Sequence, residues 1–134
     1  MYPLKGTFRV TQGYGVPSKR YASGYHDGVD FACPVGTPVY AARRGIIARN
    51  QWGKSYGTHI VCKRTFPWRS KHHLVYAHLS QVLTLPGMKV KRGQLIGLSG
   101  NTGQSTGPHL HFGERTGATF RGTKSVNPQG SLNA

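Results

Sequence analysis

Short stretches in which apolar and polar residues alternate recur along the chain and predict β-strands. A strand has a period of two, because successive side chains point to opposite faces of a sheet. The segments with this pattern are residues 8–11, 26–31, 39–42, 45–49, 59–63, 73–78, 89–91, 94–98 and 110–112. The segments at 59–63 and 73–78 are expected to pair as a hairpin.

Glycine and proline separate these segments. The chain contains 19 Gly and 8 Pro, which disfavour long helices. They mark turns at residues 34–38, 86–87, 92–93 and 100–108. No internal repeat or linker interrupts the pattern, so residues 1–134 are expected to form a single compact all-β domain, largely antiparallel. A helix longer than two turns is not expected.

Histidines at even spacings suggest a metal centre. His26 and Asp30 are four residues apart, and His109 and His111 are two apart. On a strand, even spacings place side chains on one face, so each pair is expected to point into the same cleft. His78 lies in another alternating segment and is expected to face that cleft. Two histidines and one carboxylate that leave an open position are a common ligand set of catalytic zinc.

Acidic residues are too few for a conventional carboxylate base. The chain has only Asp27, Asp30 and Glu114. Glu114 is three residues beyond His111, so on a continuous strand it faces away from the cleft, and Asp27, next to His26, is also expected to point away. With Asp30 used as a ligand, proton transfer would fall to histidine, and His78 and His109 remain for it.

Two motifs resemble those of the lysostaphin-type zinc endopeptidases. Residues 26–30 match the family's HxGxD motif, and residues 107–112 match its GPHLHF motif. Residues 34–42, 76–80, 90–107 and 127–128 are also similar to the family, in the same order. The resemblance therefore extends from about Gly13 to Pro128. One departure is Gly113, where the family commonly has glutamate.

The resemblance implies a fold and a set of site residues. The fold would be an antiparallel β-sheet with long loops around a central groove. The cofactor would be Zn²⁺, bound by His26, Asp30 and His111. His78 and His109 would flank the attacking water, one assisting its deprotonation and the other stabilising the tetrahedral intermediate; which of them is the base stays open.

Residues beside the metal set are candidates for substrate binding. Members of the family often carry a tyrosine in the loop before the first motif, and Tyr21 or Tyr25 would serve here. The glycine-rich stretch at 100–107, which includes Asn101 and Thr106, is expected to form a wall of the groove. Its small residues would let an extended substrate lie close to the backbone.

Charge indicates the kind of partner. Eighteen Lys and Arg stand against three acids, which gives a formal net charge of +15. Such a field attracts polyanions, and anionic bacterial cell-wall polymers fit. Together with the resemblance, this predicts a cell-wall lytic endopeptidase that cleaves peptide cross-bridges or stem peptides of bacterial peptidoglycan. It would act at the cell wall, outside the cell; as a phage endolysin it would be made in the host cytoplasm and released at lysis.

Other partners are not expected. No apolar run has the length of a membrane span and the N-terminus has no secretory signal pattern, so we expect no membrane association. We also expect a monomer and no specific nucleic-acid partner. Cys33 and Cys62 form either a disulfide or two buried free thiols, and no CxxC motif is present.

Two other functions compete with the enzyme. The first is a catalytically inactive domain of the same fold that binds the wall or activates another hydrolase; the presence of all five candidate metal and catalytic residues argues against it. The second is a basic nucleic-acid-binding β-domain in which Trp52, Trp68 and the tyrosines stack on bases. That alternative leaves the ordered histidine motifs unexplained.

Overall fold

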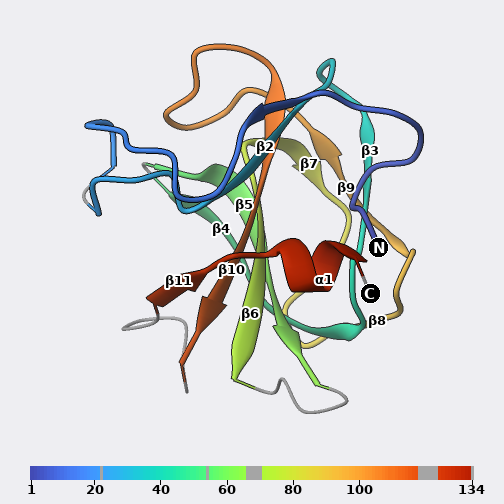
Figure 1. Ribbon diagram of the computed structural model, residues 1–134. Helices are drawn as coiled ribbons and strands as arrows, with labels where there is room; N and C mark the ends of the chain where they lie inside the picture. The colour runs from blue at the N-terminus through green and yellow to red at the C-terminus, as the bar shows by residue number, and fades with distance from the viewer. Residues whose placement is uncertain (22, 54, 66–70, 118–123, 134) are drawn as a thin grey trace.

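The chain folds into short strands and one short helix (Figure 1). The computed structural model describes all residues except 22, 54, 66–70, 118–123 and 134, and the side chains of residues 49–53 are likewise not described. In chain order, the elements are β1 (Val10–Gln12), β2 (Gly28–Ala32), β3 (Pro38–Tyr40), β4 (Gly45–Gly53), β5 (Gly57–Arg64), β6 (His72–Ala77), β7 (Leu79–Val82), β8 (Lys89–Val90), β9 (Leu95–Ser99), β10 (His109–Thr116), β11 (Lys124–Val126) and α1 (Gln129–Asn133).

The strands form two sheets. The larger has the order β1-β2-β10-β6-β5-β4-β8, and β11 also pairs with β10; the smaller has the order β3-β9-β7. Every pairing among the described strands is antiparallel. The all-β, antiparallel prediction is therefore confirmed. Strand β10 lies between β2 and β6, so residues on its two neighbours can meet its side chains.

One apolar core joins the two sheets. It includes Phe31 of β2, Val39 of β3, Ile60 of β5, Tyr76 of β6, Ile96 of β9, and Leu110 and Phe112 of β10. Burial of each aliphatic or aromatic side chain contributes about 1.5–3 kcal/mol. Because Leu110 and Phe112 face this core, the alternation of β10 turns His109 and His111 to the opposite face.

Most predicted strands are present, with shifted ends. The hairpin is confirmed, since β5 pairs with β6 and Ile60 lies opposite Tyr76. The segment predicted at 26–31 begins as a strand only at Gly28, so His26 precedes β2. The sequence did not predict β7 and β11. Helix α1 has only five residues, in line with the expected absence of long helices from the described residues.

The cysteines are buried free thiols, so the disulfide alternative is excluded for Cys33 and Cys62. Burial raises the pKa of Cys62 to about 12, so its thiol stays protonated at neutral pH. No helix within the described part of the chain combines the length and hydropathy of a membrane crossing. The stacking role considered for the tryptophans falls outside the described residues, because Trp68 and the side chain of Trp52 are not among them.

Candidate metal centre and groove

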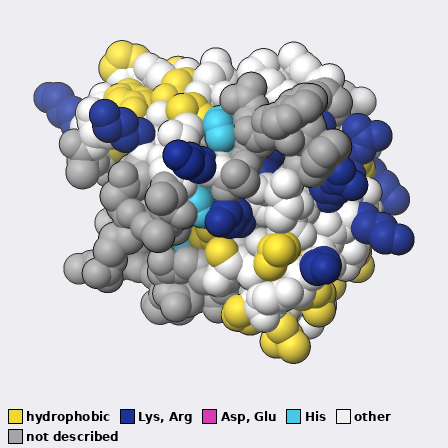
Figure 2. Space-filling view, turned by 90° about the horizontal axis from the view of Figure 1, so that it is seen from below, with side chains coloured by type: hydrophobic (Ala, Val, Ile, Leu, Met, Phe, Trp, Pro, Cys, Tyr) yellow, Lys and Arg dark blue, Asp and Glu magenta, His cyan; other side chains and the backbone are white. Residues whose placement is uncertain are grey.

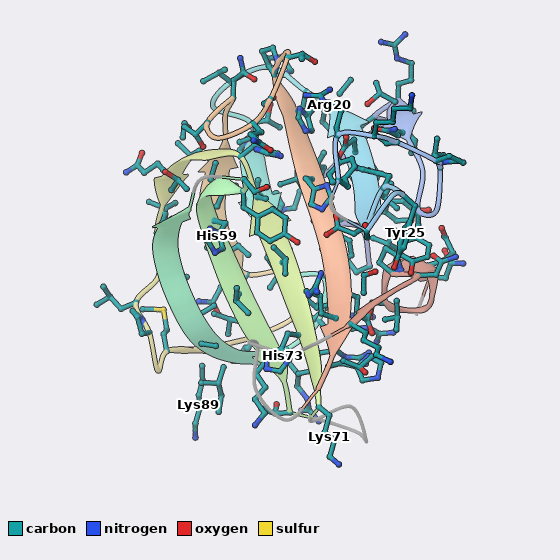
Figure 3. The ribbon with its side chains drawn as sticks, turned by 90° about the vertical axis from the view of Figure 1, so that its left-hand side faces the viewer. Arg20, Tyr25, His59, Lys71, His73 and Lys89 are labelled. Carbon is teal, nitrogen blue, oxygen red and sulfur yellow. The ribbon has the colours of Figure 1, made fainter. Side chains whose placement is uncertain are left out.

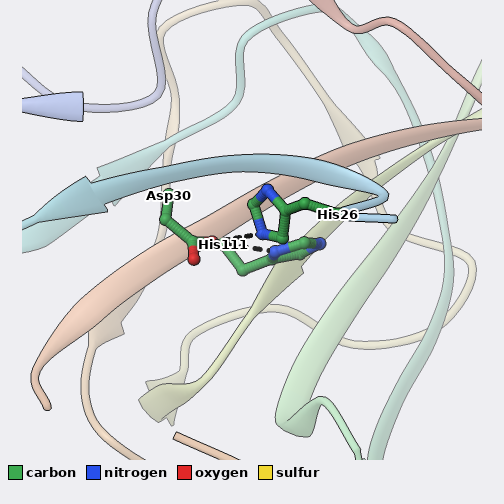
Figure 4. Close-up of side chains that lie close together, drawn as sticks. All are labelled: His26, Asp30 and His111. Carbon is green, nitrogen blue, oxygen red and sulfur yellow. Dashed lines mark hydrogen bonds and ion pairs between the residues drawn. The ribbon is translucent and has the colours of Figure 1, made fainter. Parts of the chain in front are cut away.

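Strand pairing brings the three predicted metal ligands together. Asp30 of β2 lies directly opposite His111 of β10 in the ladder, and His26 immediately precedes β2. His111 Nδ1 lies 2.9 Å from Asp30 Oδ1, and His26 Nε2 lies 3.2 Å from the same oxygen (Figure 4). One ligand atom from each residue lies within 4.8 Å of the others. The predicted convergence of the three side chains is confirmed.

The surroundings of His26 suit a metal ligand. Its Nδ1 lies 3.0 Å from the carbonyl oxygen of Gly13, and a carbonyl can only accept, so Nδ1 carries the proton. The lone pair of the neutral ring is then on Nε2, which is buried and has no hydrogen-bond partner among the described residues. A histidine that binds a metal needs a ring nitrogen that makes no hydrogen bond and lies close to the other ligand atoms, and His26 Nε2 meets both conditions. The three residues therefore fit a divalent metal ion.

His78 and His109 stand beside this cluster. Their ring centroids are 4.6 Å apart, and the His78 ring is 6.0 Å from that of His111. His78 Nδ1 donates to the carbonyl of Thr102 at 2.6 Å, and His109 Nδ1 donates to the carbonyl of Gly107 at 2.8 Å. In its neutral form each ring then has its lone pair on Nε2, and Nε2 of His109 lies 3.7 Å from Asp30 Oδ2. The pair can accept protons next to the candidate metal position.

The backbone of His78 is strained. Its φ angle of 63° is the only positive φ of a non-glycine residue in the described part of the chain. The residue connects β6 to β7, and its N–H donates to the carbonyl of Tyr56 at 2.8 Å. Left-handed backbone costs a non-glycine residue about 1–2 kcal/mol and often accompanies function. The tight turn explains why the imidazole leaves the strand and reaches the cluster.

Burial and mutual charge set the protonation of the centre. Burial acts to lower the pKa of His111, but its interactions with Asp27 and Asp30 outweigh burial and raise that pKa to about 9. Burial acts to raise the pKa of Asp30, but His111 and His26 hold that pKa below its ordinary value. Burial lowers the pKa of His78 to about 4, so this imidazole is neutral at neutral pH.

Asp27 corrects a prediction. The sequence predicts that it points away from the cleft, yet its Oδ1 lies 3.2 Å from His111 Nε2. Its other oxygen accepts hydrogen bonds from the Tyr56 hydroxyl at 3.0 Å and from Arg115 Nη1 at 3.4 Å. The prediction is wrong because Asp27 precedes the first residue of β2, so the alternation of a strand does not govern its direction.

Glu114 faces away from the centre, as predicted. Strand β10 is continuous from His109 to Thr116, and the carboxylate of Glu114 is buried on the other face. There it bonds to His72 Nδ1 and to Ser131 Oγ of α1, and it lies 3.9 Å from Arg64 Nη1. This acid therefore joins α1 to the sheet and is not a candidate base for the centre.

Two cavities adjoin the cluster. One of about 520 Å³ is lined by His78, His111 and Asp27, and one of about 360 Å³ is lined by Asp30 and His109. Arg20, Tyr21 and Gln104 line both cavities, so together they form a groove across the centre. Figure 3 shows Arg20 and Tyr25 on the segment beside β2, with Lys71 at the opposite end of the sheet from Arg20.

The predicted substrate residues differ in how near they lie to the centre. The ring of Tyr21 is 5.2 Å from that of His26. Tyr25 lines only the larger cavity, and its hydroxyl lies 2.8 Å from Ser125 Oγ. Thr106 lines the smaller cavity, whereas Asn101 is exposed and is not among the lining residues of either. Of the two tyrosines, Tyr21 is thus the one whose ring lies next to a candidate metal ligand, His26.

Several residues of the site escaped sequence reasoning. The carbonyls of Gly13, Thr102 and Gly107 fix imidazole rings, and no residue type signals such a backbone role. Tyr56 was also missed, although its ring lies 5.6 Å from that of His111. A tyrosine next to glycine at a strand start carries no motif that would have singled it out.

Comparison with known proteins gives the family. Residues 24–128 match the model of "Peptidase family M23". The chain is 39% identical over 116 residues to the peptidoglycan DD-endopeptidase ShyA of Vibrio cholerae, and the match covers 83% of this chain but only 26% of ShyA. The chain thus spans about a quarter of that relative's length.

Solved structures agree with the family match. The catalytic domain of the antimicrobial peptidase lysostaphin from Staphylococcus simulans superposes with a TM-score of 0.84 at 35% identity, over 95% of this chain and 93% of that domain. A zinc-containing peptidase from Vibrio cholerae superposes with a TM-score of 0.79 at 32% identity, over 99% of this chain and 39% of that protein. The chain therefore belongs to peptidase family M23.

Proposed function

We propose that this chain is a zinc-dependent endopeptidase that hydrolyses peptide cross-bridges or stem peptides of bacterial peptidoglycan. The observation that carries the proposal is the convergence of His26, Asp30 and His111, with His78 and His109 beside them. A relative is named as a peptidoglycan DD-endopeptidase, and a structural neighbour as an antimicrobial peptidase. An inactive wall-binding or activating domain is less well supported, because the complete five-residue set is present.

The donor set favours zinc. Two imidazole nitrogens and one carboxylate oxygen, with room for a further ligand, are typical of catalytic zinc in hydrolases. The similar Vibrio cholerae peptidase of known structure contains zinc. When bound, zinc lowers the pKa of a water molecule to about 7 and polarises a carbonyl group. In this proposal, His26 uses Nε2 and His111 uses Nδ1 as ligand atoms.

His78 and His109 are assigned the proton transfers. Each has Nδ1 committed to a backbone carbonyl, so Nε2 is the atom that can take a proton from the attacking water and pass it to the leaving amine. The pKa of about 4 keeps His78 neutral and able to accept at neutral pH. Burial raises the pKa of Tyr21 to about 12, so its phenol remains a neutral donor near the developing negative charge.

The groove and the surface charge suit a wall substrate. An extended peptide would run through the two cavities, past the loop that carries Thr106 and Gly107. The excess of Lys and Arg over acids would hold the protein on anionic wall polymers. We therefore place its action at the bacterial cell wall, as a monomer, and a phage endolysin origin is compatible with this.

Wall digestion tests the proposal. Purified walls of several cross-link chemotypes are incubated with the protein, and new amino termini are identified by mass spectrometry. The appearance of new amino termini should stop when a chelator is added and resume when zinc is added back. No new amino termini from any chemotype, by a protein that is folded and zinc-loaded, would refute the proposed activity.

Two substitutions separate metal binding from proton transfer. His109→Ala should retain zinc but lose at least about 100-fold in hydrolysis, because general acid–base catalysis contributes about that much. Asp30→Ala should lose zinc itself, because a ligand is removed. Bound zinc is measured by metal analysis after dialysis, alongside digestion. Parent-level activity in His109→Ala would contradict the proton-transfer role of His109.

A further inference from the structure

His111 is oriented differently from the other imidazoles of the site. In His26, His78 and His109 a backbone carbonyl holds Nδ1, which leaves Nε2 for the centre. In His111 it is Nδ1 that lies 2.9 Å from Asp30 Oδ1, inside the cluster. Its Nε2 is buried, and a buried N–H needs an acceptor. The acceptor at hydrogen-bond distance is Asp27 Oδ1, 3.2 Å away.

The carboxylate of Asp27 is itself held in place. Its Oδ2 accepts from the Tyr56 hydroxyl and from Arg115 Nη1. Its Oδ1 is buried and, among the described residues, has an ion-pair contact with His111 Nε2 at 3.2 Å but no hydrogen bond of regular geometry. Two donors on one oxygen therefore fix the carboxylate with its second oxygen directed at His111.

We propose that Asp27 is a positioning residue for the metal centre: by accepting a hydrogen bond from His111 Nε2, it fixes the ring orientation and the tautomer that presents Nδ1 to zinc. A neutral imidazole has one N–H, so a proton retained on Nε2 leaves the lone pair on Nδ1. Carboxylates that orient metal-binding histidines in this way also raise ligand basicity. The inference rests on the proposed role of His111 as a zinc ligand.

Other roles for Asp27 fit the geometry less well. It is not part of the ligand cluster formed by the described residues, which is limited to His26, Asp30 and His111. Both of its oxygens face other protein groups, so neither is directed at an attacking water. Its position is the first unspecified one of the HxGxD motif, so the motif does not dictate its role.

Imidazole NMR tests the proposal on the unaltered protein. Long-range ¹H–¹⁵N correlation spectra of the zinc-loaded chain should show His111 protonated at Nε2 and metal-bound at Nδ1. Its Nε2 proton should exchange slowly with water. A His111 ring bound to zinc through Nε2, or protonated at Nδ1, would overturn the proposal without any substitution.

Zinc affinity provides the second test. Competition with a chelator should show binding about 10–100-fold weaker for Asp27→Ala, with faster exchange of the His111 proton. Asp27→Asn, which keeps an acceptor oxygen, should lose less zinc affinity than Asp27→Ala. Lys124→Gln, which removes a charge from the same cavity, should bind zinc within about twofold of the parent, since it leaves the carboxylate in place. Parent-like affinity in Asp27→Ala would refute the positioning role.

These measurements use no wall substrate, so the two proposals can fail separately. If the parent binds zinc and Asp27→Ala binds it more weakly, the inference stands even where no wall is digested. A parent that binds no zinc would refute the proposed metal site and this inference together.

Discussion

At the scale of single residues, the site is organised by fixed tautomers. Backbone carbonyls of Gly13, Thr102 and Gly107 each hold one Nδ1, so three rings leave Nε2 for the candidate metal centre. These acceptors belong to the folded backbone. Such preorganisation lets imidazoles serve as ligands or proton acceptors without first rotating or changing tautomer.

The strained backbone of His78 gives a stability prediction. Both His78→Ala and His78→Gly remove the imidazole, but only glycine accepts a φ of 63° without steric cost. His78→Gly should therefore be more stable than His78→Ala by about 1 kcal/mol. Urea unfolding measures the difference.

A matched pair at His109 supplies the control. His109 begins strand β10 and has no positive φ, so there the alanine variant should be the more stable, by about 0.5–1 kcal/mol. If alanine were favoured at position 78 as well, the left-handed backbone would not be a source of strain.

Residue spacing predicted the direction of a side chain correctly where the residue lies on a regular strand. His109, His111 and Glu114 lie on continuous β10, and the faces assigned to them by alternation are correct. Asp27 precedes β2, and its direction depends on Tyr56 and Arg115, which are distant in sequence. Alternation does not apply outside a strand, which is why this one acid was misplaced.

At the scale of elements, the pairing of β2 with β10 brings Asp30 and His111 of the candidate metal site together. Gly28 of β2 lies opposite Gly113 of β10, two residues from the Asp30–His111 pair. A Cβ on Gly28 would lie 2.5 Å from the Phe112 carbonyl oxygen and 2.7 Å from the His111 ring. The two strands can approach this closely only because position 28 has no side chain.

Gly28→Ala should therefore damage both the fold and the metal site. We expect a loss of about 1–3 kcal/mol in the free energy of unfolding, typical of overpacking, together with weaker zinc binding. Gly130→Ala in α1 is the control, because its Cβ would meet nothing within 4 Å. Urea unfolding and chelator competition measure the two effects. If the two variants had equal free energies of unfolding and equal zinc affinities, the close approach of β2 and β10 would not be required.

Elements with strong local patterns were predictable, and those that depend on distant contacts were not. The hairpin of β5 and β6 combines apolar alternation with a separating loop, and the two strands pair as expected. Strand β7 follows β6 after one left-handed residue, His78, which sequence alone does not reveal. Strand β11 has three residues and is defined by its pairing with β10, so no local period marks it.

At the scale of the whole molecule, the three acidic side chains are buried or partly buried. Asp30 and Glu114 are buried and Asp27 is half-buried, while the Lys and Arg side chains that the structure describes are exposed or partly exposed, apart from buried Arg64. The face in Figure 2 shows scattered basic side chains and no acidic one among the residues it describes. The positive charge is therefore not compensated locally, and a polyanionic surface would be attracted to the molecule from many directions.

The buried titrating groups predict how stability depends on pH after zinc is removed with a chelator. The folded-state pKa of His111 is raised to about 9 from an ordinary 6.5, so its contribution is complete below pH 6.5 and is lost as pH rises through 9. The folded-state pKa of His78 is lowered to about 4, and burial also lowers the pKa of His73. These two groups make stability fall as pH drops from about 6.5 towards 4.

The free energy of unfolding of the stripped protein should therefore be greatest near pH 6.5, where neither effect operates. Each pKa unit corresponds to about 1.4 kcal/mol, so urea unfolding between about pH 4.5 and 9.5 can resolve both slopes. Zinc loading should remove the part of the alkaline slope that comes from His111, because a coordinated His111 no longer carries the extra proton, and should leave the smaller loss above pH 9 that the raised pKa of Cys62 causes. A stripped protein as stable at about pH 9.5 as at pH 6.5 would mean that the charge of His111 does not contribute to holding β2 and β10 together.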